Sequence, residues 1–187
     1  MEQLLTDIIS RMEGEKKEAN KFFGEGKYET ARKLYEHTLS VGSKLQEKVA
    51  EMKSKPLEEA DELRKEQPAF YKKYEDAFQP LIVILYSNLA MCCLKSGEYK
   101  DCIDFATKAL EINDHHEKSW YRLAMAHDKL GSYELSLEAF DSLLEINPTF
   151  PDGETMRDEV CERLKLKNSA DESKGEVASE PVSAVAA

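Results

Sequence analysis

The sequence predicts an all-α solenoid built from repeated pairs of antiparallel helices, and three observations support this fold class. Two stretches repeat each other at a spacing of 34 residues: YSNLAMCCLKSGEYKDCIDFATKALEIN begins at Tyr86, and WYRLAMAHDKLGSYELSLEAFDSLLEIN begins at Trp120. Gly97 and Gly131 occupy the same place in the two copies, where they form the turn between two helices. A weaker copy, KKEANKFFGEGKYETARKLYEHTL, lies upstream and carries Gly26 at this place. Three such repeats are about the minimum for a stable stack.

The first repeat is expected at about 11–42. An apolar stripe in MEQLLTDIISRM predicts a helix over about 2–12 that could run on into the first helix of this repeat. The segment GEG then forms the turn, and a second helix begins near Lys27.

An insertion separates the first and second repeats, at about 43–80. Tyr28 and Tyr99 are equivalent positions but lie 71 residues apart, which is 37 more than one repeat. The inserted residues are rich in Glu, Lys, Leu and Ala, so we expect lengthened helices rather than an irregular loop. Pro56 and Pro68 are suited to the first turns of helices, and Pro80 should start or kink the helix that follows.

The second repeat is expected at about 83–114 and the third at about 117–150, where Pro148 ends it. A capping helix at about 151–167, with a stripe of Met156, Val160 and Leu164, should cover the last repeat. Residues 168–187 contain no apolar cluster and are expected to form a disordered tail.

Composition limits the classes of partner. The 187 residues carry a formal net charge of −11, which argues against nucleic acid or an anionic membrane as the main partner. The longest apolar run, LIVILY at 81–86, is far shorter than the roughly 18 residues of a membrane span, and the N-terminus lacks the pattern of a signal peptide. We therefore expect a cytoplasmic protein. The apolar side chains of Leu4, Leu5, Ile8 and Ile9 could cover the first repeat or mediate self-association, and we favour the first alternative, which predicts a monomer.

Catalytic and metal-binding patterns are missing from the sequence. The cysteines, two of them adjacent as Cys92 and Cys93, are expected to be small buried residues of a reducing compartment. No Cys–His spacing suits zinc, and His115 and His116 are interpreted as linker residues. Because there is also no Ser/His/Asp set and no phosphate-binding glycine loop, we expect no enzyme and no cofactor.

Five polar residues are candidates for ligand binding, because the first helices of stacked pairs line one shared face. Lys16 and Asn20 are four residues apart on the first helix of the first repeat, and Lys118 and Arg122 are four apart in the third. Asn88 occupies in the second repeat the place that Arg122 has in the third. Together they supply three cations and two amides without a carboxylate. This set suits a peptide with a free C-terminal carboxylate next to an acidic side chain. We expect the side chains of Lys118 and Arg122 to lie in a solvated groove and to add little to stability.

Three further residues could contact the same peptide upstream of its carboxylate. Met91 and Lys95 follow Asn88 on the same helix, and a packed or solvated role is an equal alternative for both. Phe23 could line an aliphatic pocket, although core packing is the alternative that we favour.

The repeats resemble the tetratricopeptide repeat, whose period is 34 residues. The five polar residues resemble the dicarboxylate clamp of chaperone-binding tetratricopeptide domains, in the segments KKEANKF, YSNLA and KSWYRLA, with Ala19 where glycine is usual. The stretch SNLAMCCLKSGEYKDCIDFATKALEIN is especially similar to the C-terminal domains of large immunophilins. The resemblance implies a co-chaperone that binds the Glu-Glu-Val-Asp terminus of heat-shock protein 90 or heat-shock protein 70.

A second function class stays open at this point. The chain could be a scaffold that assembles a non-chaperone complex through its other faces, with an unused clamp. The five residues also do not decide between the two chaperone families, since both share the terminus that the clamp would hold.

Overall fold

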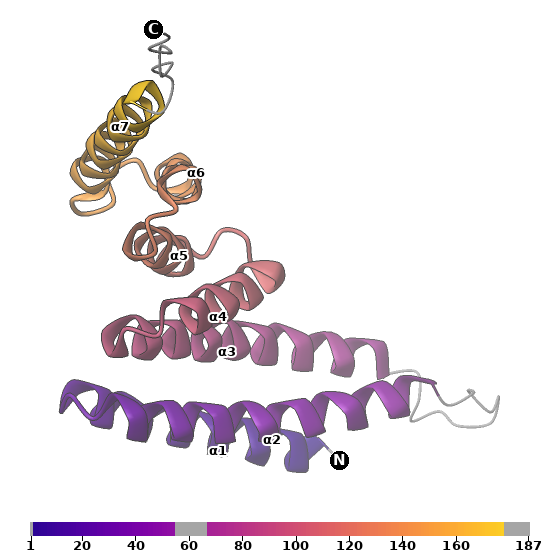
Figure 1. The fold of residues 1–187 in the computed structure, drawn as a ribbon. Coiled ribbons are helices and arrows are strands. Elements are labelled where there is room, and N and C mark those ends of the chain that lie inside the picture. Colours follow the sequence, from indigo (N-terminus) through magenta and orange to yellow (C-terminus); the bar gives the residue numbers. More distant parts are fainter. Residues whose placement is uncertain (1, 55–66, 178–187) are drawn as a thin grey trace, which may run out of the picture.

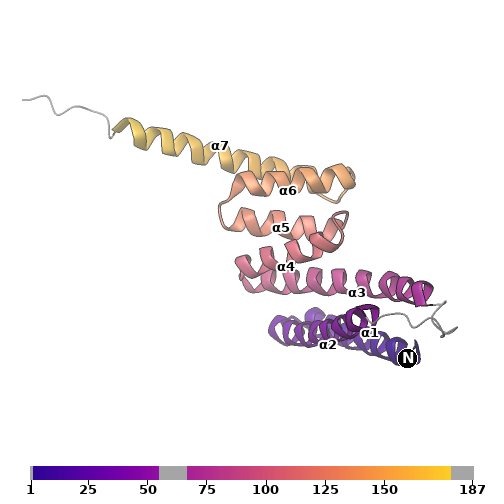
Figure 2. The ribbon, with the colours of Figure 1, turned by 90° about the vertical axis from the view of Figure 1, so that its right-hand side faces the viewer.

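The computed structural model of this chain describes residues 2–54 and 67–177, and these residues form helices and turns without a strand. The helices follow in the order α1 (Glu2–Gly24), α2 (Tyr28–Ser54), α3 (Gln67–Ser96), α4 (Tyr99–Ile112), α5 (Glu117–Lys129), α6 (Tyr133–Ile146) and α7 (Gly153–Val177). Each helix packs against the next, so that α1/α2, α3/α4 and α5/α6 form three stacked pairs with α7 at the end (Figures 1 and 2). The predicted all-α solenoid is confirmed.

The turn inside each pair is made by a glycine in the left-handed backbone region. Gly26, Gly97 and Gly131 have φ values of 76°, 79° and 71°. Residues with a Cβ rarely adopt this conformation, which glycine adopts without steric strain. The three glycines that align in the sequence therefore have the same structural role.

The insertion lengthens the helices that flank it. Residues 43–54 belong to α2 and residues 67–80 belong to α3, so both described parts of the predicted insertion are helical. Pro56 lies outside the described residues. Pro68 is the second residue of α3, a position without need for a backbone N–H.

Pro80 does not start a helix, because α3 is continuous from Gln67 to Ser96. The proline ring is exposed, while Phe78 and Leu81 on either side of it are buried. Packing of these neighbours holds the helix together across the missing hydrogen bond. Tertiary contacts thus outweigh the local preference of proline.

The N-terminal stripe and the insertion build one core. The predicted helix over 2–12 is the first half of α1, which continues unbroken to Gly24. Its buried side chains, Leu5 and Met12, belong to the same cluster as residues of the lengthened helices, namely Leu45, Val49, Tyr74, Phe78 and Leu81. The extension of α1 therefore covers the surface that the insertion adds to α2 and α3.

One segment of the described chain, Tyr74–Ser96, is long and apolar enough to span a membrane by length and composition, with a mean hydropathy of 1.7. More than half of it, 56%, is buried inside the protein. This segment lies in α3, which packs against α2, α4 and α5. Burial on several sides accounts for its apolar character.

The C-terminal helix is longer than predicted. We expected the capping helix to end near residue 167, but α7 continues to Val177, so the predicted disorder is wrong for residues 168–177. Val160 is buried and Met156 packs beside it, which anchors the helix. Figure 2 shows α7 next to α6, the helix that it contacts. A helix that packing has already nucleated can extend beyond its packed part, because each added residue gains one backbone hydrogen bond. Residues 178–187 lie outside the described part.

Candidate functional site: the shared face of α1, α3 and α5

The first helices of the three pairs lie side by side. Helix α3 contacts both α1 and α5, so the three helices that carry the sequence-predicted residues are neighbours. We call the surface that they share, with Lys16, Asn20, Asn88, Lys118 and Arg122, the clamp face.

The side chains of Asn20 on α1 and Asn88 on α3 both contact the hydroxyl of Tyr35, a residue of α2. The Asn88 amide donates to Asn20 Oδ1 at 3.2 Å, and the Tyr35 hydroxyl donates to the same oxygen at 2.5 Å. Because two donors hold the Asn20 oxygen, its NH₂ group remains to donate to another molecule. Burial raises the pKa of Tyr35 to about 12, so the phenol stays a donor at neutral pH.

Arg122 lies deeper than predicted. The sequence suggested a solvated side chain, but Arg122 is only 7% exposed. Its Nη1 donates to the hydroxyl of Ser87, a residue of α3 that is 1% exposed. The expectation of a solvated position is therefore wrong for Arg122. The side chain of Ser87, next to Asn88 on α3, is small, and the long side chain of Arg122 packs against it.

A chain of polar groups continues behind Arg122. The hydroxyl of Ser119 donates to Ser87 Oγ at 3.1 Å, and His116 Nδ1 lies 2.9 Å from Ser119 Oγ. His116 is the residue before α5 and was interpreted as a linker residue, but the structure gives it a place in this buried network. Burial and the positive charges of Arg122 and Lys118 lower the pKa of His116.

The Arg122 guanidinium has no carboxylate partner among the described residues. Its Nε is buried without a hydrogen-bond acceptor in the same part of the chain. Burial accordingly lowers the pKa of Arg122 from its ordinary value of 12.5 to about 10, which leaves it charged at neutral pH. Buried charges are ordinarily paired, so this cation is an exception that calls for a partner.

The two lysines of the clamp face are more accessible. Lys16 is half-exposed and Lys118 is exposed, and no hydrogen bond or ion pair joins either of them to Asn20, Asn88 or Arg122 within the described ranges. They add positive charge to the clamp face without fixed contacts. The structure thus gives hydrogen bonds to Asn20, Asn88 and Arg122, whereas within the described ranges no such bond joins the two lysines to them.

The three candidates for upstream contacts differ in their surroundings. Phe23 packs against the core of the first repeats, with its ring centroid 5.1 Å from that of Tyr28, which favours the packing role. Met91 is half-buried and Lys95 is exposed on α3. Both remain able to contact a ligand that passes over α3.

Tyr35, Ser87 and Ser119 are not among the site residues that the sequence predicts. The signal for Ser87 was present in YSNLA, where a hydroxyl precedes the predicted asparagine. Ser119 similarly stands between Lys118 and Arg122, on the side of α5 that faces α3. Small polar residues on the buried side of a helix require partners, and this requirement could have indicated a network.

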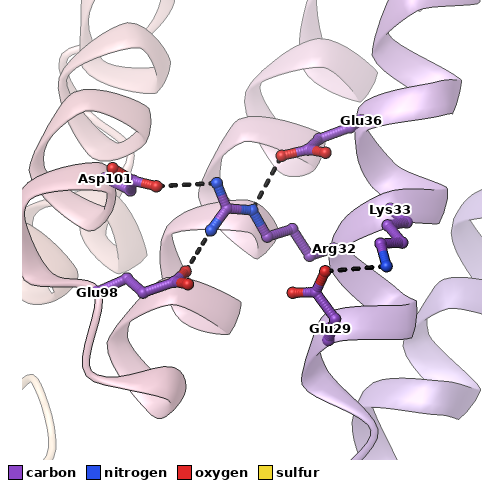
Figure 3. A network of polar contacts seen from close by, with 6 residues as sticks. All are labelled: Glu29, Arg32, Lys33, Glu36, Glu98 and Asp101. Carbon is purple, nitrogen blue, oxygen red and sulfur yellow. Dashed lines mark hydrogen bonds and ion pairs between the residues drawn. The ribbon is translucent and has the colours of Figure 1, made fainter.

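One group of described residues has the side chains for a metal ion. Cys93, Glu98 and Asp101 bring their ligand atoms within 4.8 Å of one another. The guanidinium of Arg32 already bonds to both carboxylates and also to Glu36, at 2.9 Å (Figure 3). Burial raises the pKa of the Cys93 thiol to about 12, which disfavours the thiolate that a metal would need. This group is better explained as an ion-pair network between α2 and α4.

Comparison with known proteins identifies the repeats. The family model described as tetratricopeptide repeat matches residues 83–116 and 117–150, which cover α3 from Val83 to the turn after α6. The chain contains two tetratricopeptide repeats, one in each matched range. In these terms α3/α4 and α5/α6 are two matched repeats, and α1/α2 is a pair with the same turn geometry that precedes them.

Two human relatives share part of this tetratricopeptide region. Sperm-associated antigen 1 of Homo sapiens is 30% identical over 84 residues, which are 45% of this chain and 9% of that protein. Peptidyl-prolyl cis-trans isomerase FKBP4 of Homo sapiens is 30% identical over 110 residues, which are 54% of this chain and 24% of that protein. The chain therefore spans less than a quarter of the length of these relatives.

Solved structures share the fold over most of the chain. The C-terminal tetratricopeptide domain of a Plasmodium falciparum FK506-binding protein matches with a TM-score of 0.69 at 22% identity, over 88% of this chain and 95% of that one. The second tetratricopeptide domain of human RPAP3 was solved in complex with the HSP70 peptide SGPTIEEVD. It matches with a TM-score of 0.54 at 21% identity, over 78% of this chain and 91% of that one. The first tetratricopeptide domain of Spaghetti was solved with the HSP90 peptide SRMEEVD. It matches with a TM-score of 0.58 at 16% identity, over 83% of this chain and 94% of that one.

Proposed function

We propose that the clamp face binds the free C-terminus of an acidic peptide of the Glu-Glu-Val-Asp type, and that the protein is an adaptor for the chaperones that end in this sequence. The observation that carries the proposal is Arg122, a cation that is 7% exposed and has no carboxylate partner in the described part of the chain. A bound carboxylate would supply the missing partner.

The groups around Arg122 support an anionic ligand because they offer donors. The oxygen of Asn20 is occupied by Tyr35 and Asn88, so the amide NH₂ of Asn20 is the part that faces a ligand. Lys16 and Lys118 add accessible positive charge. Charge-assisted hydrogen bonds from such donors are roughly twice as strong as neutral ones.

A peptide terminus suits this arrangement better than a small inorganic anion. The donors come from three helices, so they can hold two carboxylates, that of the chain terminus and that of an adjacent acidic side chain. The domains of human RPAP3 and of Spaghetti, which have this fold, were solved with peptides that end in Glu-Glu-Val-Asp. Their ligands support the choice of peptide and leave open which of the two chaperone families this chain prefers.

The test is a calorimetric titration with the peptide SGPTIEEVD as its free acid and as its C-terminal amide. We expect the free acid to bind more tightly than the amide by a factor of about ten or more. Amidation deletes an anion that takes part in contacts of roughly 1.5–3 kcal/mol each. Added salt should weaken binding of the free acid, since exposed charges such as those of the lysines are screened beyond about 8–10 Å.

Equal affinities for the two peptides would contradict the proposal. If neither peptide binds while the chain still assembles with another protein, the second function class applies, that of a scaffold that uses its other faces.

A further inference from the structure

We infer that Ser87 is a positioning residue, which holds the Arg122 guanidinium in place on the clamp face with support from Ser119. This inference rests on the proposed function, because an ordered guanidinium raises affinity only if it contacts the carboxylate of a ligand. Ser87 would touch no ligand itself. It would set the affinity through Arg122.

The geometry singles out Ser87 as the anchor of this side chain. Its hydroxyl accepts from Arg122 Nη1 and also from the hydroxyl of Ser119. Both serines are buried, Ser87 at 1% and Ser119 at 0% exposure, so water does not compete for these bonds. The Arg122 Nε has no acceptor among the described residues, which makes the Ser87 bond the polar contact that fixes the guanidinium.

A fixed guanidinium matters because arginine has a long side chain with several rotatable bonds. Immobilising one such side chain on binding lowers affinity by about two- to tenfold. When Ser87 has already ordered Arg122 in the free protein, this loss does not occur at the moment of binding. The expected role of Ser87 is therefore preorganisation of the clamp face.

The network extends to the start of α5. His116 Nδ1 contacts Ser119 Oγ at 2.9 Å, which leads from the helix start through Ser119 to Ser87. The Ser119 hydroxyl donates to Ser87, and its oxygen can accept from His116 when Nδ1 carries the proton; bonds linked in this way polarise one another. The Ser119 bond thereby helps to keep the Ser87 oxygen in place for Arg122.

The chain offers a matched control for a serine substitution. Ser136 on α6 is also fully buried at 0% exposure, and its hydroxyl donates to the carbonyl of Ala124 at 2.8 Å. Ser136→Ala therefore removes a buried, hydrogen-bonded hydroxyl, as Ser87→Ala does, without contact to Arg122. Any effect on folding that is common to buried serines should appear in both variants.

The experiment compares the free-acid and amidated forms of SGPTIEEVD on wild type, Ser87→Ala, Ser119→Ala and Ser136→Ala. Ser87→Ala should lower affinity for the free acid about three- to tenfold and reduce the ratio between the two peptides. Ser119→Ala should act in the same direction by about two- to threefold. Ser136→Ala should keep the wild-type ratio. Ser87→Thr, which retains the hydroxyl, should restore the affinity that Ser87→Ala loses.

A second readout does not depend on a ligand. In the free protein the ¹H–¹⁵N resonance of Arg122 Nε should be resolved and slow to exchange, and Ser87→Ala should shift it and speed its exchange, whereas Ser136→Ala should not. An unchanged resonance in Ser87→Ala, or a wild-type or raised affinity for the free acid, would overturn the inference. If wild type fails to distinguish the peptides, the proposed function fails, and the resonance alone then decides whether Ser87 holds Arg122.

Discussion

The hydroxyl of Tyr35 donates to Asn20 Oδ1 at 2.5 Å, which joins a residue of α2 to a predicted ligand-binding residue of α1. Asn88 donates to the same oxygen from α3. The clamp face is thus ordered from beneath by a second helix of a pair, although the residues predicted to bind peptide all belong to first helices.

Replacement of Tyr35 by phenylalanine should therefore weaken peptide binding. Tyr35→Phe removes the donor that orients Asn20, and we expect affinity for a free-acid peptide to fall about three- to tenfold, the equivalent of one hydrogen bond. The measurement is calorimetric titration with the free-acid peptide.

Tyr74→Phe is the matched control for this substitution. Tyr74 is 5% exposed, against 1% for Tyr35, but its hydroxyl is buried without a hydrogen-bond partner in the described structure. Removal of an unsatisfied hydroxyl should leave stability equal or higher and binding unchanged. A Tyr35→Phe variant that binds as tightly as wild type would rule out the orienting role.

The ion-pair network of Arg32 should stabilise the stack of α2 on α4. Arg32 is one-fifth exposed and bonds to Glu36, Glu98 and Asp101, whereas its neighbour Lys33 is 73% exposed and pairs with Glu29 alone (Figure 3). Arg32→Met should lower the free energy of unfolding by about 1–2 kcal/mol, because two carboxylates of the second repeat lose their shared cation.

Lys33→Met is the control, and it should change the free energy of unfolding by less than about 0.5 kcal/mol, as is usual for an exposed pair. Both values follow from urea unfolding monitored by circular dichroism. Equal effects of the two substitutions would show that the network between α2 and α4 adds nothing beyond a surface pair.

Stability should fall as the pH is lowered from about 7.5 to 5.5. Burial lowers the pKa values of His116 and His127 below the ordinary value of 6.5. Below pH 6.5 the two histidines therefore bind protons in the unfolded chain that they do not bind in the folded chain. Their contribution to the free energy of unfolding is fully present above this pH and is lost on acidification.

The contribution of His116 can be isolated by His116→Asn, which keeps a side chain suited to the residue before a helix. We expect a smaller loss of unfolding free energy between pH 7.5 and 5.5 than in wild type, measured by urea unfolding at each pH. His115→Asn is the control, since His115 lies in the adjacent position with a 78% exposed side chain. A wild-type pH profile in His116→Asn would contradict the assignment.

The sequence was sufficient for the fold because its signals are local and repeated. The spacing of 34 residues located α3 to α6, and the glycines at 26, 97 and 131 marked three turns with the same backbone geometry. Pro80 did not mark a helix start, because proline preference is a local signal and the buried residues around it are a tertiary one. The extent of α7 was missed because residues 168–177 have no apolar stripe and include Asn, Ser, Asp and Gly, which do not mark a helix in the sequence.

The candidate site was predictable in its helices and only partly in its chemistry. Helical spacing predicted that Asn20, Asn88 and Arg122 share one surface. The contacts of α3 with α1 and α5 are consistent with this prediction. The burial of Arg122 depends on the small Ser87 of another helix, and the orientation of Asn20 depends on Tyr35 of a third. Such contacts between helices leave no periodic trace in a single sequence.

Arg122 should be a residue that serves binding at the expense of stability. Its lowered pKa, about 10 instead of 12.5, corresponds to a cost of about 3 kcal/mol for keeping the charge in its buried place. An apolar side chain of similar length removes this cost, since replacement of buried charges by well-packed hydrophobic residues is often neutral or stabilising. Arg122→Ala would instead leave a cavity and is the less informative variant.

Thermal unfolding of Arg122→Met with and without the free-acid peptide tests this account most directly. Wild type should melt at a higher temperature when the peptide is present, because a ligand that binds the folded state stabilises it. Arg122→Met should melt without peptide at the wild-type temperature or above it, and the peptide should not shift its transition. A variant that melts several degrees below wild type and is still stabilised by the peptide would show that Arg122 is a structural residue, and would contradict the account.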